Sequence, residues 1–388
     1  MYNIVYNYIK GELIHMTTYL IKSFKRIEDI RQKGKIKHLL LDIIFIAIVA
    51  TLADMDDWEE IEEYAKLKRK WFEKYLELPY GIPSGDTIKR VFQAIDSKLF
   101  LQCFMEWTQL IAEKINKQGI VAIDGKTMCG SYDNSTGKKA LHIVSAWFSE
   151  TGMVLGQVKT YEKSNEITAI PELLDILNIT GNIVTIDAMG TQKDIAEKII
   201  SRKGDYVLAL KGNHPLLHSE VVEFFEEIHD EKFRKDYCIN HYRQVDKGHG
   251  RNEIRDYYIT SKINWMDARK EWKELTSIGM VIYTRESKED KKQECRYFLC
   301  SIDADTEKFS YAVRKHWGIE SMHWSLDVTF REDAKRTRKE NAPENLAILH
   351  KFAYNILKNE KSDKKSLKIK RLRASLNEEY LEKLFSGM

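Results

Sequence analysis

The sequence predicts an α/β protein in which helices flank a mixed sheet, with a helical domain before the sheet and a β-rich insertion within it. Three observations predict this fold. Residues 24–112 show helical, amphipathic patterns and few glycines; from Gly119 onward short β-branched runs alternate with helical segments; and the helical signal fades between residues 233 and 300. Strands interleaved with helices are typical of a mixed sheet.

The first residues give no sign of export. The opening Met-Tyr-Asn-Ile-Val-Tyr-Asn-Tyr lacks the basic region and the continuous apolar stretch of a secretory signal, so we expect a cytoplasmic protein with no membrane partner. Residues 1–23 form an extension without an assigned role, and Met16 is an alternative start. The five cysteines form no C-x-x-C pair, which favours free thiols in a reducing compartment and no structural zinc.

The helical domain contains one strongly apolar helix and two recognisable helix starts. The longest apolar run, Ile43 to Ala53, is about half of the roughly 20 residues that a membrane span needs, and it predicts a buried helix. Acids precede the amphipathic stretch that begins at Trp58, where a helix N-terminus favours negative charge. After a turn at Pro79–Pro83, Ser84 or Asp86 is expected to cap the next helix.

The sheet is expected to be built from residues 113–232 and 301–360, with the insertion at 233–300. Apolar, β-branched runs predict strands at 120–123, 141–147, 154–158, 183–186 and 206–210, and in the insertion at 257–260, 279–283 and 296–299. Helical patterns fall near 167–177 and 193–200, and again at 307–324 and 344–357. Gly248-His-Gly250 predicts a turn within the insertion.

Charge is nearly balanced overall and unevenly distributed. The net charge is +3, from 62 basic and 59 acidic residues. Seven acids lie within Asp54–Glu63, and eight basic residues lie within Lys358–Arg373. We therefore expect residues 361–388 to form a basic C-terminal tail, for which binding to DNA phosphates and simple solvation both remain open.

Two predicted strands end in the same way. They read Ile120-Val-Ala-Ile-Asp124 and Ile183-Val-Thr-Ile-Asp187. A continuous apolar run indicates a strand covered on both faces, and open α/β sheets bind their ligands at the carboxyl ends of such strands. Each aspartate alone has a plainer interpretation as a helix cap or turn former. The repetition favours a shared site.

A third acid comes from a predicted helix. At about 100° per residue, Phe309, Val313, Trp317 and Trp324 form one stripe, and Glu320 falls within it. The pattern predicts a carboxylate that faces the core. A buried glutamate requires a partner, so this one requires a cation, a hydrogen-bond network, or the plainer alternative of a salt bridge to an arginine.

Three acids at one edge of a sheet predict a metal-dependent site. Asp124, Asp187 and Glu320 are the expected catalytic and metal-binding residues, with Mg²⁺ as the cofactor and Mn²⁺ as a possible substitute. Two such ions roughly 4 Å apart activate the attacking oxygen and stabilise the leaving one in an in-line displacement at phosphorus. The expected chemistry is phosphodiester cleavage and transfer.

Other motifs in the sequence are less specific. Gly119 with Gly125-Lys126-Thr127 is similar to a phosphate-binding loop, but five residues separate the glycines where the motif has four. His316, Glu320 and His323 lie at i, i+4 and i+7 of one helix and are a weak alternative for zinc, without an H-E-x-x-H pattern. No G-x-S-x-G elbow or cysteine-protease signature occurs.

Several longer motifs carry a family resemblance. They are Ala122-Ile-Asp-Gly-Lys126, Glu162-Lys-Ser-Asn-Glu166-Ile-Thr-Ala-Ile-Pro171, Thr185-Ile-Asp-Ala-Met189, Tyr206-Val-Leu-Ala-Leu-Lys-Gly-Asn213, Gly248-His-Gly-Arg251-Asn-Glu253, His316-Trp-Gly-Ile-Glu320 and Leu326-Asp-Val-Thr-Phe-Arg-Glu-Asp333. In this order they resemble the H-repeat-associated (ISAs-type) insertion-sequence transposases, over roughly residues 24–385. The helical domain resembles the one associated with that family, through Trp58-Glu-Glu-Ile61 and Ile82-Pro-Ser-Gly-Asp-Thr87.

The resemblance implies a ribonuclease-H-like, DDE-type catalytic domain interrupted by a β-rich insertion, and it assigns the metal-binding acids to Asp124, Asp187 and Glu320. One departure stands out. Related transposases usually carry Y-x2-R-x3-E-x6-K on the glutamate helix, whereas this chain has Val313, His316, Glu320 and Asp327 at those positions. The inference that DNA ends pass through a hairpin is therefore weakened, and the inferred metal chemistry is unaffected.

The expected function is DNA transposition by a bacterial enzyme. Water first nicks a transposon end, and the freed 3′-hydroxyl then attacks target DNA at the same carboxylates. The expected partners are double-stranded DNA and further copies of the chain, as a homodimer or higher oligomer. Two alternatives remain: a ribonuclease-H-like nuclease or resolvase without transposition, and an inactive DNA-binding relative that acts as a repressor.

Four residues near the proposed site are candidates for DNA contact: Lys126, Lys211, Arg251 and His316. The three cations each adjoin a strand end or turn, and each has the alternative of a plain surface charge. The helix tryptophans have two interpretations as well. Trp317 and Trp324 are expected to pack in the core, with stacking on an extruded base as the alternative.

Overall fold

A computed structural model describes residues 23–115, 117–132, 137, 139–160, 165–248, 251–287 and 290–386. Its centre is a nine-stranded sheet in the order β3-β2-β1-β4-β5-β9-β8-β7-β6. Helices cover both faces, and the predicted mixed α/β sheet flanked by helices is confirmed. The strands are β1 (Ile120–Met128), β2 (Leu141–Phe148), β3 (Met153–Thr160), β4 (Ile183–Ile186), β5 (Asp205–Leu210), β6 (Asn240–Gly248), β7 (Arg251–Thr260), β8 (Ser277–Glu286) and β9 (Lys291–Cys300).

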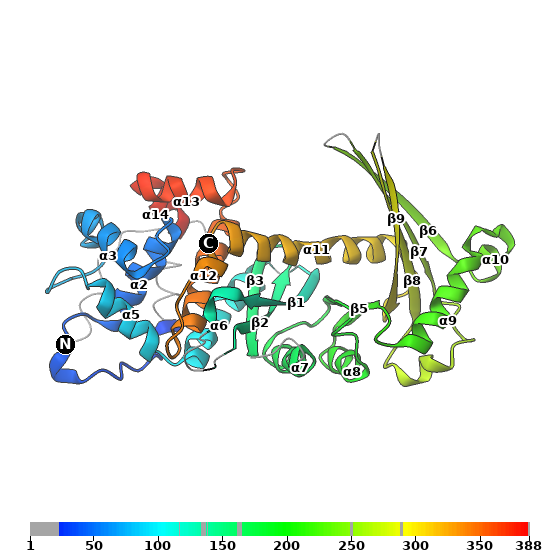
Figure 1. Cartoon of the computed structure of the whole chain (residues 1–388), viewed down its shortest axis with the longest axis horizontal. Coiled ribbons are helices and arrows are strands. Elements are labelled where there is room, and N and C mark those ends of the chain that lie inside the picture. The colour runs from blue at the N-terminus through cyan, green and yellow to red at the C-terminus, as the bar shows by residue number, and fades with distance from the viewer. Residues whose placement is uncertain are drawn as a thin grey trace.

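Five strands form the first half of the sheet. β1, β2 and β3 are antiparallel neighbours, whereas β1, β4 and β5 run parallel. The helices α7 (Glu166–Ile176), α8 (Lys193–Ser201) and α9 (Pro215–Glu226) share a core with one face of the sheet. The long helix α11 (Thr306–Val328) lies across the other face, as Figure 1 shows.

The β-rich insertion is an extension of this same sheet. Strand β9 pairs antiparallel with β5, and β8, β7 and β6 follow as an antiparallel meander. Its strands are nine or ten residues long, well beyond the short runs expected. In Figure 1 one end of these strands rises above the rest of the sheet, and α9 and α10 (Glu231–Asp236) lie to the right of their lower part. The expected turn at Gly248–Gly250 falls partly outside the described residues.

The N-terminal helices share one hydrophobic core with the C-terminal part of the chain. They are α2 (Leu40–Leu52), α3 (Trp58–Leu67), α4 (Arg69–Phe72), α5 (Gly85–Ala94) and α6 (Ser97–Ile115), at the left in Figure 1. The core they build also takes in Ile319, Met322 and Leu326 from α11. Helix α12 (Ala342–Asn359) lies in its middle, with residues 342–357 buried on every side. Helix α11, which lies across the sheet, therefore also packs against the N-terminal helices.

Local chemistry explains where these helices begin. Asp57 caps α3 by accepting from the backbone N–H of Glu59 at 2.9 Å, and Ser84 caps α5 by accepting from Thr87 at 3.3 Å. The apolar run after Leu39 becomes α2 and is buried as predicted. No helix among the described residues has the length and apolarity to cross a membrane. All five cysteines are free.

The expected basic tail is folded. Residues 367–386 form α13 (Leu367–Leu376) and α14 (Glu378–Ser386), which pack against the N-terminal helices. Lys370 and Arg371 are buried within the molecule. The prediction of a solvated or phosphate-binding tail is wrong at these two positions, because internal acceptors take up both side chains.

Candidate active site

Asp124 and Asp187 lie side by side on neighbouring parallel strands. The pairing of β1 with β4 ends at Ile123 and Ile186, so each aspartate is the next residue after the last parallel pair. Strand β1 then continues to Met128 alongside β2, beyond the end predicted from the sequence. This arrangement brings the two predicted acids together at one edge of the parallel pairing.

Both aspartates face helix α11. Val121, Ile123 and Ile186 belong to the core on the other face of the sheet, so alternation along the strands directs Asp124 and Asp187 away from that core. Thr185, two residues before Asp187, confirms the direction, because its Oγ1 lies 2.9 Å from Nδ1 of His316 on α11.

Glu320 reaches the site from the exposed side of α11. The buried residues of this helix include Phe309, Val313, Ile319, Met322 and Leu326, and Glu320 is exposed. Trp317 and Trp324 are 37% and 62% exposed, so the expectation that they pack in the core is wrong. The predicted apolar stripe is wrong too. The helix packs first on the sheet and then on the N-terminal helices, and one stripe cannot serve two cores.

The electrostatics nevertheless link Glu320 to the aspartates. Partial desolvation of its carboxyl group against the protein raises the pKa of Glu320, and the negative charge of Asp124 raises it further. Burial also raises the pKa of Asp187, again with a contribution from Asp124. Burial pushes the pKa of Asp124 upward, but His323 and His316 lower it by more, and the net direction is downward. The negative charge of Asp124 thus acts on both of the other two carboxylates.

Two histidines of α11, His316 and His323, lie between this helix and the strands that carry the aspartates. Nδ1 of His323 lies 3.4 Å from Oδ2 of Asp124, while its buried Nε2 has no hydrogen-bond partner. Burial lowers the pKa of His316, which is held by Thr185. His316 therefore packs beneath the acids. Within the described part of the chain, no three His, Cys, Asp or Glu side chains converge closely enough to form a metal site as they stand, and this holds for the weak zinc alternative too.

The candidate DNA-contacting cations are differently placed. Lys126 is nearly buried, and its Nζ lies 2.5 Å from Asp327 Oδ1 and 2.5 Å from Glu332 Oε2. It has no free charge to offer a phosphate in this structure. Lys211 follows β5 and is exposed. Arg251 begins β7, and its side chain lies outside the described part of the structure. Because Gly125 to Thr127 belong to strand β1, the phosphate-loop alternative is wrong.

Two features beside the acids were not foreseen. Arg296 on β9 stacks on Trp317 at 4.8 Å, and its charge acts on Glu320. A cavity of about 270 Å³ opens there between the sheet and α11. Its lining includes Arg255, Tyr283, Arg296, Val313, Arg314 and Trp317. No local pattern announces this cavity, because its walls come from strands and a helix that are distant in sequence.

The second feature lies behind Asp124, on the opposite face of the sheet. Nε2 of His142 lies 2.6 Å from Oε1 of Glu166, and Nδ1 of His142 lies 2.8 Å from Oγ1 of Thr127. Gly125 must lack a side chain, because a Cβ there would come within 2.3 Å of Glu166. Glu166 belongs to one of the longer motifs of the sequence, whose residues 162–164 lie outside the described residues.

Comparison with known proteins identifies the family. The family model described as a transposase DDE domain matches residues 115–356, and the model of its associated domain matches residues 21–108. The putative transposase YncI of Escherichia coli O157:H7 is 45% identical over 367 residues, which cover 93% of each chain. The H repeat-associated putative transposase YhhI of Escherichia coli strain K12 is 38% identical over 376 residues, covering 95% of this chain and 98% of the relative.

Two further matches are weaker. A relative named as an inactive transposase, YbfQ of Escherichia coli strain K12, is 36% identical over 63 residues, which cover 16% of this chain and 75% of the relative. Among solved structures, a piggyBac transposase complex with hairpin DNA matches with a TM-score of 0.37 and 12% identity, covering 98% of this chain and 80% of that one, a similarity too low to carry any conclusion. The family models and the long alignments agree, and the chain belongs to the DDE-domain transposases of the H-repeat-associated group.

Proposed function

We propose that this transposase cuts DNA at the ends of its insertion sequence and joins the freed ends to target DNA, with Asp124, Asp187 and Glu320 as the catalytic residues. The observation that carries the proposal is the pair Asp124 and Asp187 at the edge of two parallel strands, with the charge of Asp124 raising the pKa of Asp187 and of Glu320 on the facing helix. Perturbed carboxylates that raise one another's pKa are typical of functional sites, because folding alone does not favour them.

The donor set fits divalent metal ions, which the DDE transposase family generally uses. Carboxylate oxygens are the ligands that Mg²⁺ and Mn²⁺ prefer. Asp124, Asp187 and Glu320 would hold the ions, and two ions are the number we propose. When bound, such ions supply the positive charge that activates an attacking oxygen and stabilises a leaving oxygen at phosphorus. The repulsion between Asp124 and each of the other two acids supports this assignment, because a bound cation would relieve it.

The surrounding residues hold the acids in place. The backbone N–H groups of Met189 and Gly190 donate to Oδ1 of Asp187 at 3.1 and 3.2 Å, which fixes that carboxylate at the strand end. His323 does the same for Asp124 from the helix side. His316 is hydrogen-bonded to Thr185 beneath the acids, and burial lowers its pKa. Water and the 3′-hydroxyl are the successive nucleophiles of the two proposed steps.

The test is strand cleavage on DNA that carries the sequences flanking the gene. Asp124→Asn, Asp187→Asn and Glu320→Gln are each compared with wild type in Mg²⁺, in Mn²⁺ and in a chelator. We expect each substitution to slow cleavage at least about 100-fold, equivalent to about 2.7 kcal/mol. Glu307→Gln is the matched control, because Glu307 is an exposed acid in the first turn of the same helix.

The products decide between the proposed reaction and its alternatives. Joined products between a defined DNA end and a second duplex identify transposition. Cleavage without joining would identify a nuclease or resolvase. DNA binding with no cleavage by the wild-type chain would identify an inactive relative, and undiminished Mg²⁺-dependent cleavage by the substituted chains would overturn the residue assignment.

A further inference from the structure

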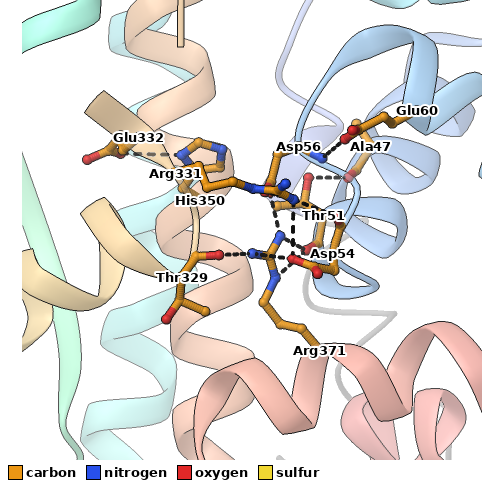
Figure 2. Close-up of polar contacts among 10 residues, drawn as sticks. All are labelled: Ala47, Thr51, Asp54, Asp56, Glu60, Thr329, Arg331, Glu332, His350 and Arg371. Atoms are coloured by element: carbon orange, nitrogen blue, oxygen red, sulfur yellow. Dashed lines mark hydrogen bonds and ion pairs between the residues drawn. The ribbon is translucent and has the colours of Figure 1, made fainter. Parts of the chain in front are cut away.

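One buried arginine joins three distant parts of the chain (Figure 2). Arg371, on α13, is 0% exposed and forms ion pairs with Asp56 and, at 2.9 Å, with Asp54. It also donates to the carbonyl oxygens of Thr51, at 2.9 Å, and of Thr329. The loop between α2 and α3, the end of α11 and helix α13 thus meet at one guanidinium. Such a buried cation is tolerated only when its donors are satisfied.

The same contacts hold the turn that follows α11. Arg331 donates from Nε to Oδ2 of Asp56 at 3.0 Å, so Asp56 receives both arginines. The Arg371 guanidinium lies 4.2 Å from the ring centre of Phe330, which is buried beneath it. Arg331 has a φ of 53°, in the left-handed region that costs a non-glycine residue about 1 kcal/mol. Contacts from the N-terminal helices maintain this conformation.

The next residue reaches in the opposite direction. Glu332 is 2% exposed, and in Figure 2 it lies on the far side of Arg331 from the Arg371 cluster, beside His350. Its Oε2 accepts from Nζ of Lys126 at 2.5 Å. Lys126 lies on β1 two residues after Asp124 and pairs with Asp327 of α11 as well. Two adjacent residues of one turn therefore connect the N-terminal helices to the strand that carries Asp124.

We propose that Arg371 is a positioning residue of the active site, through which the N-terminal helices and α13 brace helix α11. The contact between Asp56 and Arg331 holds the turn after α11 in place. The contact between Glu332 of this turn and Lys126 then ties the turn to strand β1. The brace keeps Glu320 on the helix and Asp124 on the strand in their relative places. The inference rests on the proposed function for its cleavage readout and adds a role for the helical domain.

A purely stabilising role is the rival explanation, and Lys370 provides the matched control. Lys370 is the neighbouring residue on α13 and is 5% exposed, but it donates to the carbonyl oxygens of Leu357 and Glu360 at the end of α12. Arg371→Met and Lys370→Met each remove one buried cation from α13. We expect both to lower the Tm. Only Arg371→Met is expected to slow cleavage, by 10-fold or more, when assayed well below both melting temperatures.

A second comparison separates positioning from stability. In the double variant Arg371→Met/Glu332→Gln the two effects on the cleavage rate are expected to overlap, since both substitutions break one connection. Lys370→Met/Glu332→Gln is expected to cleave at the rate of Glu332→Gln alone, because Lys370→Met does not slow cleavage. Affinity for DNA in a chelator should stay within about 2-fold throughout. If Arg371→Met does not fold, Arg331→Met takes its place in the test. This variant removes the contact between the half-exposed Arg331 and Asp56, and it is expected to slow cleavage for the same reason.

Hydrogen exchange supplies a readout that is independent of cleavage. Backbone amides of residues 126–128 are expected to exchange faster in Arg371→Met than in Lys370→Met. Equal exchange in the two variants, or rate losses that track the Tm alone, would overturn the brace. If the wild-type chain does not cleave DNA, the proposed function fails and the exchange result still decides whether the brace exists.

Discussion

Two charged clusters flank the end of strand β1, and they are balanced in opposite ways. On one side, Lys126 pairs with Asp327 and Glu332, and beyond the turn Arg371 pairs with Asp56. In the other cluster the charge of Asp124 raises the pKa of Asp187 and of Glu320, whereas His323 and His316 lower the pKa of Asp124. The first cluster, in which cations and carboxylates pair with each other, is the closed cluster, and its pairs stabilise the folded state. The three acids Asp124, Asp187 and Glu320 are the open cluster. Their repulsion lowers the free energy of unfolding, as expected for a site that binds cations.

The largest expected effect comes from opening the closed cluster. Lys126→Met removes the cation between Asp327 and Glu332 and leaves a buried carboxylate without its main partner. We expect a loss of about 3–5 kcal/mol in the free energy of unfolding, measured by denaturant titration. Lys193→Met is the control, because its pair with Glu271 is exposed, and it should change stability by less than about 1 kcal/mol. If both variants lose the same free energy of unfolding, the Lys126 pairs contribute no more to stability than an exposed ion pair does, and the closed cluster does not stabilise the fold.

A smaller effect, with a defined pH dependence, is expected for Glu332→Gln. Burial alone would raise the pKa of Glu332, but Lys126 and His350 outweigh it and hold the pKa well below its ordinary 4.5. The ionised carboxylate therefore stabilises the folded state above pH 4.5, and this stabilisation is lost as the pH falls through the lowered value. We expect a loss of about 1–3 kcal/mol in the variant at pH 7. The difference from wild type should shrink below pH 4.5.

The smallest effect has the opposite sign and comes from the open cluster. The pKa of Glu320 is raised by partial desolvation and by Asp124, so its ionised form destabilises the folded state at pH 7. In the absence of metal, Glu320→Gln is expected to raise the Tm by about 1 °C at pH 7. The gain should disappear as the pH falls toward 4, where the wild-type carboxyl is protonated as well. A lower Tm in the variant at pH 7 would mean that Glu320 has a stabilising partner.

The strands and the paired aspartates were predictable because the evidence for them is local. Ile120–Ile123 and Ile183–Ile186 are continuous apolar runs, and parallel pairing places the residue after each run at the same edge. The helix stripe failed for a physical reason. Trp317 and Trp324 are apolar but lie on the exposed side of a helix that crosses from one core to another.

Charge pairing across the chain could not be predicted from local patterns. The sequence places Lys126 at a strand end, and only folding brings Glu332 to it from 206 residues away. Arg371 belongs to a basic run of the sequence and Asp56 to an acidic run, and no local pattern pairs the two runs. The burial of this one pair among many exposed charges depends on how α13 packs, which the sequence does not reveal.

We propose that the open cluster binds the metal ions required for DNA cleavage. Exchanging one of its carboxylates for a thiol tests this proposal. Asp124→Cys exchanges a carboxylate for a thiolate, which binds Mg²⁺ poorly and accepts softer ions such as Mn²⁺ more readily. Cleavage of the flanking DNA should be lost in Mg²⁺ and restored at least in part in Mn²⁺, whereas Glu307→Cys should cleave in both. Full Mg²⁺-dependent cleavage by Asp124→Cys would contradict the account.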